Sequence, residues 1–361
     1  MKENNNCFYN PSARYRFALD AKRKLENART EIVDCLHGKN GKLVFTSSAT
    51  ESNNMIASGL HLRAGQVVLI SEGEHPSVYN AFLRLSAKGI VVKKIPLSSN
   101  GRVDENKFLE LLSSEVALVS IIHVSNETGA INDIEKLCKL AKNVNPKIIF
   151  HSDGVQAVGK TKINLEKLGV DAYTISAHKI YAPRGIAGLW LKNGVTIDPI
   201  LEGGGQESGL RSSTENVSGA LALAWCMKKV TADFEVNYEK ILKLKNELIG
   251  ELEASEISNS LKVNSNNDST PYIVSISFIG IKGEVLMNAL DGDGVIVSTG
   301  SACSSKKAGN RILEAMGLDA EQVVGSVRIS FSPYENYDVK FIATKIINNV
   351  ARFLKNAKVK V

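Results

Sequence analysis

The chain has 361 residues, of which 43% are hydrophobic and 23% are charged. This is the composition of a globular protein, and at about 150 residues per domain the length predicts two domains. Disordered, collagen-like and rod-shaped coiled-coil proteins are excluded. The net charge of +6 is small for this length, so we expect no direct nucleic-acid binding. No apolar run approaches the roughly 20 residues that span a bilayer, and the polar residues 1–6 do not resemble a secretory signal. We therefore expect a cytoplasmic protein without membrane contact.

Five cysteines are spread along the chain: Cys7, Cys35, Cys138, Cys226 and Cys303. No two of them have Cys-x-x-Cys spacing, and an odd number in a chain without a secretory signal favours free thiols. A zinc site built from them is not expected. Cys138 and Cys226 are predicted to pack in helices, Cys35 lies on an amphipathic stretch, and Cys7 lies in a polar tail.

Short β-branched runs alternate with helical segments over the first half of the chain, after an amphipathic stretch at 25–36. The predicted strands are 43–45, 67–70, 91–95, 116–122, 148–151, 172–175 and 188–191. Several are apolar throughout, as in strands that are buried on both faces. Amphipathic segments such as 78–87 and 134–141 lie between them. This alternation predicts an α/β fold with a mostly parallel sheet covered by helices.

The rest of the chain has a different pattern. Residues 217–252 are predicted to be helical, and the Ser/Asn-rich residues 258–269 are predicted to form a loop at a domain boundary. Then follow a strand at 272–279, a helix at 284–290, a strand at 295–297, a helix at 312–316, a strand at 327–331 and a helix at 339–353. This order predicts a small α+β domain. We expect a large domain at 12–255 and a small domain at 256–361, which residues 1–11 join.

A lysine follows the predicted strand 172–175, in the sequence Ser-Ala-His-Lys at 176–179. Ligands of such sheets bind at the carboxyl ends of the strands, and a lysine amine forms an imine with pyridoxal phosphate. Ser176 and His178 can donate hydrogen bonds to the phosphate of that cofactor. The alternative is that Lys179 is a surface lysine.

Two further segments could serve the same ligand. Asp153 follows the buried run 148–150, and its carboxylate could keep a pyridine ring protonated, which makes the ring a better electron sink. The alternative is that Asp153 caps the next helix. The hydroxyl-rich residues 47–54 precede a predicted helix, whose N-terminus can bind an anion. The alternative is an ordinary cap with Ser48 or Thr50 as the N-cap residue.

Cys303 differs from the other cysteines because small polar residues surround it and Lys306 and Lys307 follow it. Nearby lysines favour the thiolate, which is the nucleophilic form of the side chain. The sequence therefore predicts an exposed, reactive thiol.

In this order the motifs resemble those of cysteine desulfurases of the NifS and IscS type, in the aminotransferase class V family of fold-type I pyridoxal-phosphate enzymes. The resemblance runs from about Asn10 to the C-terminal helix. Besides Asp153, Gln156 and residues 176–179, its motifs lie at 10–12, 45–54, 74–75, 125–129, 203–207, 211–214 and 300–303. It implies a large domain with a mostly parallel, seven-stranded sheet of the pyridoxal-phosphate transferase type, and a smaller α+β C-terminal domain.

The resemblance also implies roles for individual residues. Lys179 resembles the lysine that binds the cofactor and moves the Cα proton, and His75 resembles the imidazole that stacks on the ring and acts as acid or base for the substrate thiol. The other implied cofactor contacts are Ala49, Thr50, Asn126, Asp153, Gln156, Ser176, His178 and, from the other subunit of a homodimer, Thr214. Asn126 and Arg328 resemble the groups that hold the substrate carboxylate, for which Arg is suited.

The reaction implied is the conversion of L-cysteine to L-alanine, with the sulfur left as a persulfide on Cys303. A sulfur acceptor protein, either an iron–sulfur scaffold or a tRNA-thiolation enzyme, would then take it, with transient contact between Cys303 and an iron–sulfur cluster. No resident metal is expected. The alternatives are a selenocysteine lyase, another class V enzyme, or a low-activity or binding-only relative.

The chain departs from the family pattern at two places. It opens almost directly on residues 8–11, without the first strand of the family. We therefore expect it, as given, to bind the cofactor but to turn over cysteine poorly, unless Met1 marks an incomplete start. Residues 331–334 read Phe-Ser-Pro-Tyr where many relatives have Gly-Arg-Phe-Thr, a change of little consequence because Arg328 is present.

Overall fold

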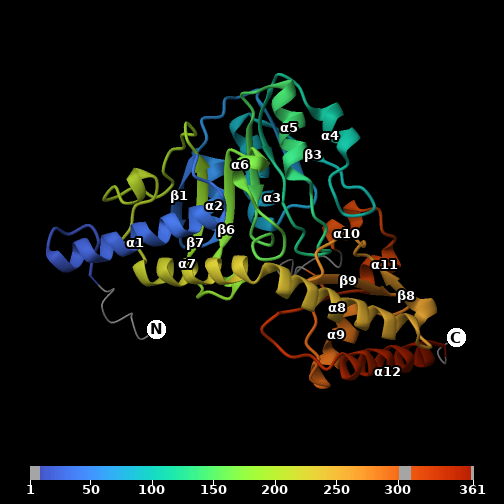
Figure 1. Cartoon of the computed structure of the whole chain (residues 1–361). Coiled ribbons are helices and arrows are strands. Elements are labelled where there is room, and N and C mark those ends of the chain that lie inside the picture. Colours follow the sequence, from blue (N-terminus) through green and yellow to red (C-terminus); the bar gives the residue numbers. More distant parts are fainter. Residues whose placement is uncertain (1–8, 301–309, 359–361) are drawn as a thin grey trace. The chain divides into compact units, whose positions relative to one another are not determined.

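The computed structural model describes residues 9–300 and 310–358 (Figure 1). Contacts within the chain divide it into two compact units. Unit 1 is Met1–Ile95, Glu105–Val124 and Asn132–Phe234, and unit 2 is Pro96–Asp104, Ser125–Ile131 and Glu235–Val361. Each unit is described by itself below. The domain boundary expected between residues 255 and 256 stays a prediction.

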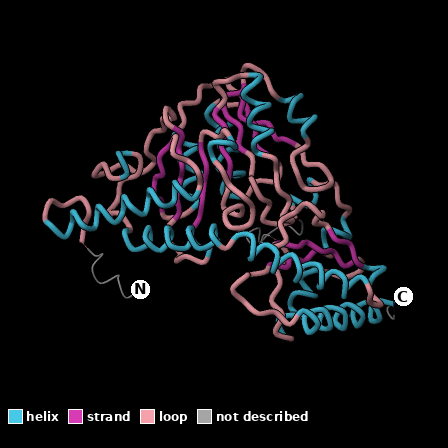
Figure 2. The backbone as a smooth tube through the Cα atoms, viewed as in Figure 1, coloured by secondary structure: helices cyan, strands magenta, loops and turns pink. Residues whose placement is uncertain are grey.

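Unit 1 contains a seven-stranded sheet, shown in magenta with cyan helices around it in Figure 2. The strand order is β1-β7-β6-β5-β4-β2-β3; β7 runs antiparallel to both of its neighbours and the other pairs are parallel. The strands are β1 Gly41–Thr46, β2 Val67–Ser71, β3 Val91–Ile95, β4 Val116–Ser120, β5 Ile149–Asp153, β6 Ala172–Ser176 and β7 Ala187–Lys192. The prediction of a mostly parallel, seven-stranded α/β sheet is confirmed.

Helices cover this sheet because the strands are apolar on both faces. Val68 and Leu118 lie side by side on one face and Leu69 and Val119 on the other, and all four are fully buried, which leaves no face of the central strands for water. Helices α1 and α7 pack along each other, as Figure 1 shows. The helices are α1 Arg16–Cys35, α2 Ala49–Gly59, α3 Pro76–Leu83, α4 Glu105–Leu111, α5 Ile134–Val144, α6 Leu165–Leu168 and α7 Val217–Ala232.

Unit 2 is built on a three-stranded antiparallel sheet in the order β10-β9-β8. Its strands are β8 Leu261–Val263, β9 Ile273–Phe278 and β10 Ser326–Ser330, and its helices are α8 Phe234–Glu253, whose first residue belongs to unit 1, α9 Gly283–Gly292, α10 Arg311–Ala315, α11 Ala320–Val324 and α12 Val339–Lys358. Apolar side chains of α8, α9 and α12, such as Leu248, Leu286 and Ile346, form one core with Ile276 of β9. The predicted small α+β fold is thus present.

Three predicted segments differ in detail from the structure. The helical region predicted at 217–252 consists of two helices: α7 ends at Ala232, where the N–H of Asp233 turns back to the carbonyl groups of Lys229 and Thr231, and α8 starts at Phe234. The predicted loop 258–269 contains β8, which pairs with β9. The strand expected at 295–297 is absent: Ile296 is 85% exposed, and the neighbouring Ser298 forms only an isolated bridge with Arg328.

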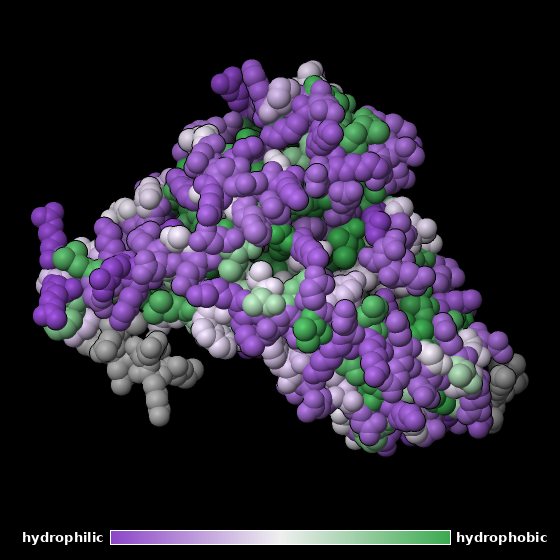
Figure 3. Space-filling model, viewed as in Figure 1, coloured by the Kyte–Doolittle hydropathy of each residue, from purple (hydrophilic) through white to green (hydrophobic). Residues whose placement is uncertain are grey.

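No helix in the described part of the chain is both long and apolar enough to cross a bilayer. The face shown in Figure 3 is mostly hydrophilic, with apolar residues scattered over it.

Candidate functional site

Two chemically distinctive side chains lie where neighbouring strands of unit 1 end. Strands β5 and β6 are parallel and adjacent; β5 ends at Asp153 and β6 at Ser176. Lys179 follows β6 in the short 3-10 turn Ala177–Ile180 and is exposed. Since parallel strands end at the same edge of a sheet, the carboxylate and the lysine share the edge at which such sheets bind ligands.

The Asp153 carboxylate is inside the protein, with 3% of the residue exposed. Its Oδ1 accepts a hydrogen bond from the Val155 N–H and its Oδ2 one from Asn53 Nδ2, each at 3.0 Å. Burial raises the pKa of Asp153, against these two hydrogen bonds and the nearby charge of His75. Because burial disfavours its charged form, this carboxylate would be stabilised by a cationic partner such as a protonated ring nitrogen. The alternative role as a helix cap is wrong, because the next helix, α6, has Asn164 as its N-cap.

Asn53 is also connected, through the hydroxyl of Ser77, to His75, which lies between β2 and α3. Its Nδ2 lies 2.9 Å from Ser77 Oγ, and that hydroxyl lies 2.8 Å from His75 Nδ1. His75 is the N-cap residue of α3, and its Nδ1 accepts a hydrogen bond from the Ser77 N–H at 3.2 Å. Asp153 and His75, which were predicted from separate motifs, are therefore connected through Asn53 and Ser77, neither of which had been given an individual role from the sequence.

The N-terminus of α2 presents hydrogen-bond donors. Ser48 is the N-cap residue, and its side chain accepts a bond from the Glu51 N–H at 3.1 Å. Of the two N-cap residues considered from the sequence, Ser48 and Thr50, the structure has Ser48. The N–H groups of Ala49 and Thr50 have no partner among the described residues. Unpaired donors at the positive end of a helix favour an anion such as a phosphate.

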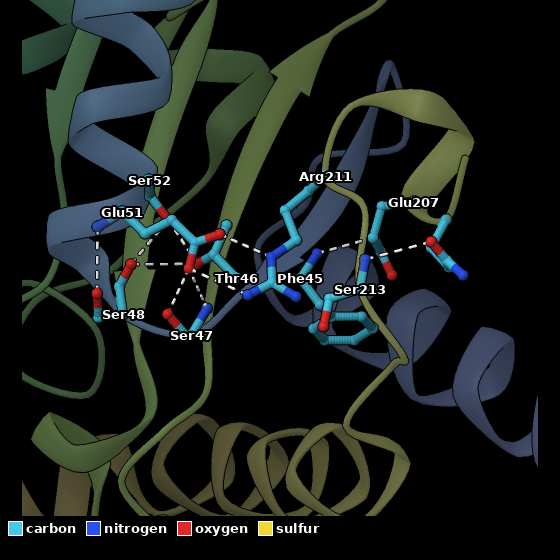
Figure 4. A network of polar contacts seen from close by, with 10 residues as sticks. Phe45, Thr46, Ser47, Ser48, Glu51, Ser52, Glu207, Arg211 and Ser213 are labelled. Atoms are coloured by element: carbon cyan, nitrogen blue, oxygen red, sulfur yellow. Dashed lines mark hydrogen bonds and ion pairs between the residues drawn. The ribbon is translucent and has the colours of Figure 1, made fainter. Parts of the chain in front are cut away.

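Two carboxylates, Glu51 and Glu207, fix the segment that carries Arg211 and Ser213 (Figure 4) and continues to Thr214. Glu207 accepts hydrogen bonds from Arg29 Nη1 at 2.7 Å and from the Phe45 N–H at 2.9 Å. Glu51 accepts one from Arg211 Nε at 2.7 Å. These bonds hold the segment against β1 and the start of α2.

Thr214 itself is exposed. It lies in an open hollow that Ser47, Gly185 and Arg211 also line. The ion pairs therefore hold Thr214, the predicted phosphate contact, beside the residues that precede α2.

Replacing Glu51 by Gln is expected to lower the free energy of unfolding by about 1–3 kcal/mol near neutral pH, because Arg211 would lose its charged partner. Burial tends to raise the pKa of Glu51, but bonds from Arg211 and Ser47 outweigh burial and hold the pKa below the usual 4.5. Such a group stabilises the fold above its unfolded pKa, and this contribution is lost as the pH falls through the folded pKa. In urea unfolding, the difference between wild type and variant should be constant near pH 7 and shrink below pH 4.5. A difference that persists in strong acid would contradict the assignment.

Positive charge gathers around Lys179. Burial and the charge of Lys179 lower the pKa of Lys160 to about 7. Burial, then Lys179, Arg184, His75 and Lys160, lower the pKa of His178, whose Nδ1 lies 2.9 Å from Ser176 Oγ. The potential around these groups favours an anionic ligand. Lys160 was not predicted from the sequence. The only signal that could have indicated it is its position shortly after Asp153.

In unit 2, Arg328 and Asn126 are brought together, as predicted. Arg328 Nη1 donates to the carbonyl of Asn126 at 2.9 Å and to Glu127 Oε1 at 3.1 Å. Glu127 is buried and also accepts bonds from Asn126 Nδ2 at 2.6 Å and from Asn310 Nδ2 at 3.0 Å. Among the described residues no group forms a hydrogen bond with Nε or Nη2 of Arg328, so this edge of the guanidinium can bind a carboxylate through two parallel hydrogen bonds. The sequence had given Glu127 and Asn310 no role.

Cys303 and Cys7 lie outside the described residues. Cys35, Cys138 and Cys226 are free thiols. Burial raises the pKa of all three, that of Cys138 to about 12. They are therefore poor nucleophiles at neutral pH.

The family profile described as Aminotransferase class-V matches residues 2–339. The chain belongs to this family. Similar class V proteins include a cysteine desulfurase IscS of Dictyoglomus turgidum, 34% identical over 331 residues that cover 91% of this chain and 83% of that protein. A cysteine desulfurase IscS 1 of Archaeoglobus fulgidus is also 34% identical over 331 residues, covering 91% of this chain and 85% of that protein. The resemblance found from the motifs is confirmed.

Solved structures show the same fold as this class V chain. One described as a NifS-like protein superimposes with a TM-score of 0.88 at 31% identity, covering 96% of this chain and 92% of that one. Another, of SspA in complex with cysteine, has a TM-score of 0.78 at 27% identity and covers 92% and 93% of the two chains.

Class V enzymes of this kind depend on pyridoxal 5′-phosphate, and the residues of unit 1 fit that cofactor. Buried Asp153 suits a protonated ring nitrogen, and the unpaired N–H groups of Ala49 and Thr50 suit a phosphate. Lys179, exposed at the same sheet edge, suits its aldehyde.

Proposed function

We propose that this protein is a pyridoxal-phosphate-dependent cysteine desulfurase, which converts L-cysteine to L-alanine and retains the sulfur as a persulfide on Cys303. The observation that carries the proposal is the placement of buried Asp153 at the end of β5 and of exposed Lys179 just after the adjacent parallel strand β6. The relatives named cysteine desulfurase, at 34% identity over nine-tenths of the chain, support L-cysteine as the substrate.

The residues of unit 1 would hold the cofactor. When bound, the cofactor supplies a ring that withdraws electrons from the substrate Cα. Asp153 would hold the ring nitrogen in its protonated form, and Gln156 would donate a hydrogen bond to the ring hydroxyl. Lys179 would anchor the aldehyde, and its amine would remove the substrate Cα proton and return a proton to carbon. The remaining contacts are to the phosphate, from Ala49, Thr50, Ser176 and His178, with Asn126 as a further cofactor contact.

The substrate would be held by its carboxylate. The Nε–Nη2 edge of Arg328 and the side chain of Asn126 bind this group, and His75 exchanges a proton with the substrate thiol. The Cys303 thiolate attacks the substrate sulfur: an S–S bond forms, the C–S bond breaks and its electron pair stays on the carbon skeleton. Protonation of that skeleton gives alanine, so one cysteine yields one alanine and one persulfide.

We further propose a homodimer in which Thr214 reaches the phosphate bound by the partner copy. Exposure of Thr214 at the end of a segment fixed by two partly buried carboxylates supports this role. The persulfide would pass in the cytoplasm to an acceptor protein, either an iron–sulfur scaffold or a tRNA-thiolation enzyme. In light scattering, a stable monomer with full cofactor occupancy would rule out the dimer.

The activity is tested by incubating the holoenzyme with L-cysteine and an excess of dithiothreitol. Alanine and sulfide are expected in a ratio of one to one. Formation of pyruvate or of a transamination product in place of alanine, or the absence of any product, would overturn the assignment.

A further inference from the structure

Four side chains of unit 1 form a continuous hydrogen-bonded line from Asp153 to His75. Asn53 Nδ2 bonds to Asp153 Oδ2 at 3.0 Å and to Ser77 Oγ at 2.9 Å, and Ser77 Oγ lies 2.8 Å from His75 Nδ1. Asn53 is completely buried and Ser77 is partly buried. Water therefore has little access to the middle of this line.

The direction of each bond follows from the carboxylate. An ionised Asp153 can only accept, so the NH₂ group of Asn53 must face it. Turning the amide round would bring Oδ1 against the carboxylate, and it would gain nothing on the other side, where Asn53 Oδ1 has no partner among the described residues. The second N–H of Asn53 then occupies a lone pair of Ser77 Oγ.

The serine hydroxyl hydrogen is thereby left for the histidine. It can be donated to His75 Nδ1, which also accepts the Ser77 backbone N–H at 3.2 Å. Two donors from one residue converge on the same ring nitrogen. A neutral imidazole has one donor nitrogen and one acceptor nitrogen, so Nδ1 is the acceptor and the ring proton is on Nε2.

We propose that Asn53 and Ser77 are positioning residues that fix His75 in the Nε2–H tautomer, so that Nε2 carries the ring proton and is the atom that donates a proton to the substrate. The inference rests on the proposed function, which makes His75 the acid or base for the substrate thiol. The line also connects the orientation of this imidazole to the carboxylate that serves the cofactor ring.

If Ser77 had a purely structural role, a different result would be expected. His75 is the N-cap residue of α3, so Ser77 could matter only for the start of that helix. In that case its replacement would change the stability of the protein and leave the ring tautomer as it is. The tautomer is therefore the quantity to measure.

The test compares Ser77→Ala, Ser77→Thr and the matched control Ser218→Ala. Ser218 has the same place in α7 as Ser77 in α3, the second helical residue, and its Oγ bonds to the N-cap residue Asn216 at 3.3 Å. Holoenzyme is prepared with ¹³C- and ¹⁵N-labelled histidine, and the His75 signals are identified with a His75→Asn variant. The ring ¹⁵N and ¹³Cδ2 shifts then report the tautomer.

Wild type and Ser77→Thr are expected to show the Nε2–H form. Loss of one hydrogen bond shifts an equilibrium by about fivefold, so Ser77→Ala should increase the Nδ1–H population about fivefold. It should also lower kcat for L-cysteine by about the same factor, with KM nearly unchanged. Ser218→Ala should change neither quantity.

The inference is overturned if Ser77→Ala keeps the wild-type His75 shifts, or if Ser218→Ala changes them as much. If no protein, wild type included, forms alanine from L-cysteine, the proposed function fails. The histidine spectra still decide between the two roles of Ser77 in that case.

Discussion

Replacing Lys179 by Ala is expected to abolish covalent attachment of pyridoxal phosphate and to lower alanine formation by a factor of about 1,000 or more, because the variant loses both the cofactor anchor and the group that moves the Cα proton. The fold should remain, since Lys179 is exposed and the turn that carries it is held by backbone bonds, such as that from the Ala177 N–H to the Ile186 carbonyl. Borohydride reduction followed by mass spectrometry measures the attachment.

Lys167→Ala is the matched control for this experiment. Lys167 is also exposed and lies in unit 1, in the short helix α6. The control should keep wild-type attachment, activity and circular dichroism. A Lys179→Ala protein that still retained the cofactor after reduction, with normal turnover, would show that another amine has the role assigned to Lys179.

Replacing Cys303 by Ser should leave cofactor binding intact and remove the protein-bound persulfide. An alcohol is a far weaker sulfur acceptor than a thiolate, because almost none of it is ionised at neutral pH. Mass spectrometry after a brief incubation with L-cysteine should find one added sulfur atom on wild type and none on the variant. Alanine formation without a reductant should fall to background.

The described cysteines provide the controls for that experiment. Burial raises the pKa of Cys35 and of Cys226, so Cys35→Ser and Cys226→Ser should form persulfide at the wild-type rate. If the added sulfur were instead lost with Cys35, Cys303 would not be the acceptor.

The fold was predictable where burial alone decides the structure. Runs such as Val67–Ser71 and Ala172–Ser176 are buried along their whole length, and apolar composition identifies them. Leu261–Val263 was missed because three residues in a polar segment become a strand only through pairing with β9. The strand expected at 295–297 fails for the converse reason: β-branched residues there have no neighbouring strand to pair with for most of their length. The presence or absence of a partner strand, which the composition of the segment itself does not reveal, decided both cases.

The residues of the candidate site were likewise predictable only in part. Asp153 and Lys179 could be located from sequence because each follows a recognisable strand. Asn53 and Ser77 could not, because their roles depend on a meeting of α2, α3 and β5 that no local pattern encodes. Glu127 stands next to a predicted residue, yet its bonds to Arg328 and Asn310 join segments that are far apart along the chain.

The position of β1 has a consequence for the order in which the protein can fold and bind its coenzyme during synthesis. Among the described strands, β1 pairs with β7 alone, so residues 41–46 find their place in the sheet only when residues 187–192 are available. The chain continues from β1 into the N-terminal turn of α2, where Ala49 and Thr50 present their N–H groups. A ribosome releases the first strand long before its partner, and such long-range pairing forms slowly. In a nascent chain shorter than 192 residues, the turn that presents Ala49 and Thr50 therefore lacks the strand that anchors it, and we expect the coenzyme to bind stably only late in synthesis.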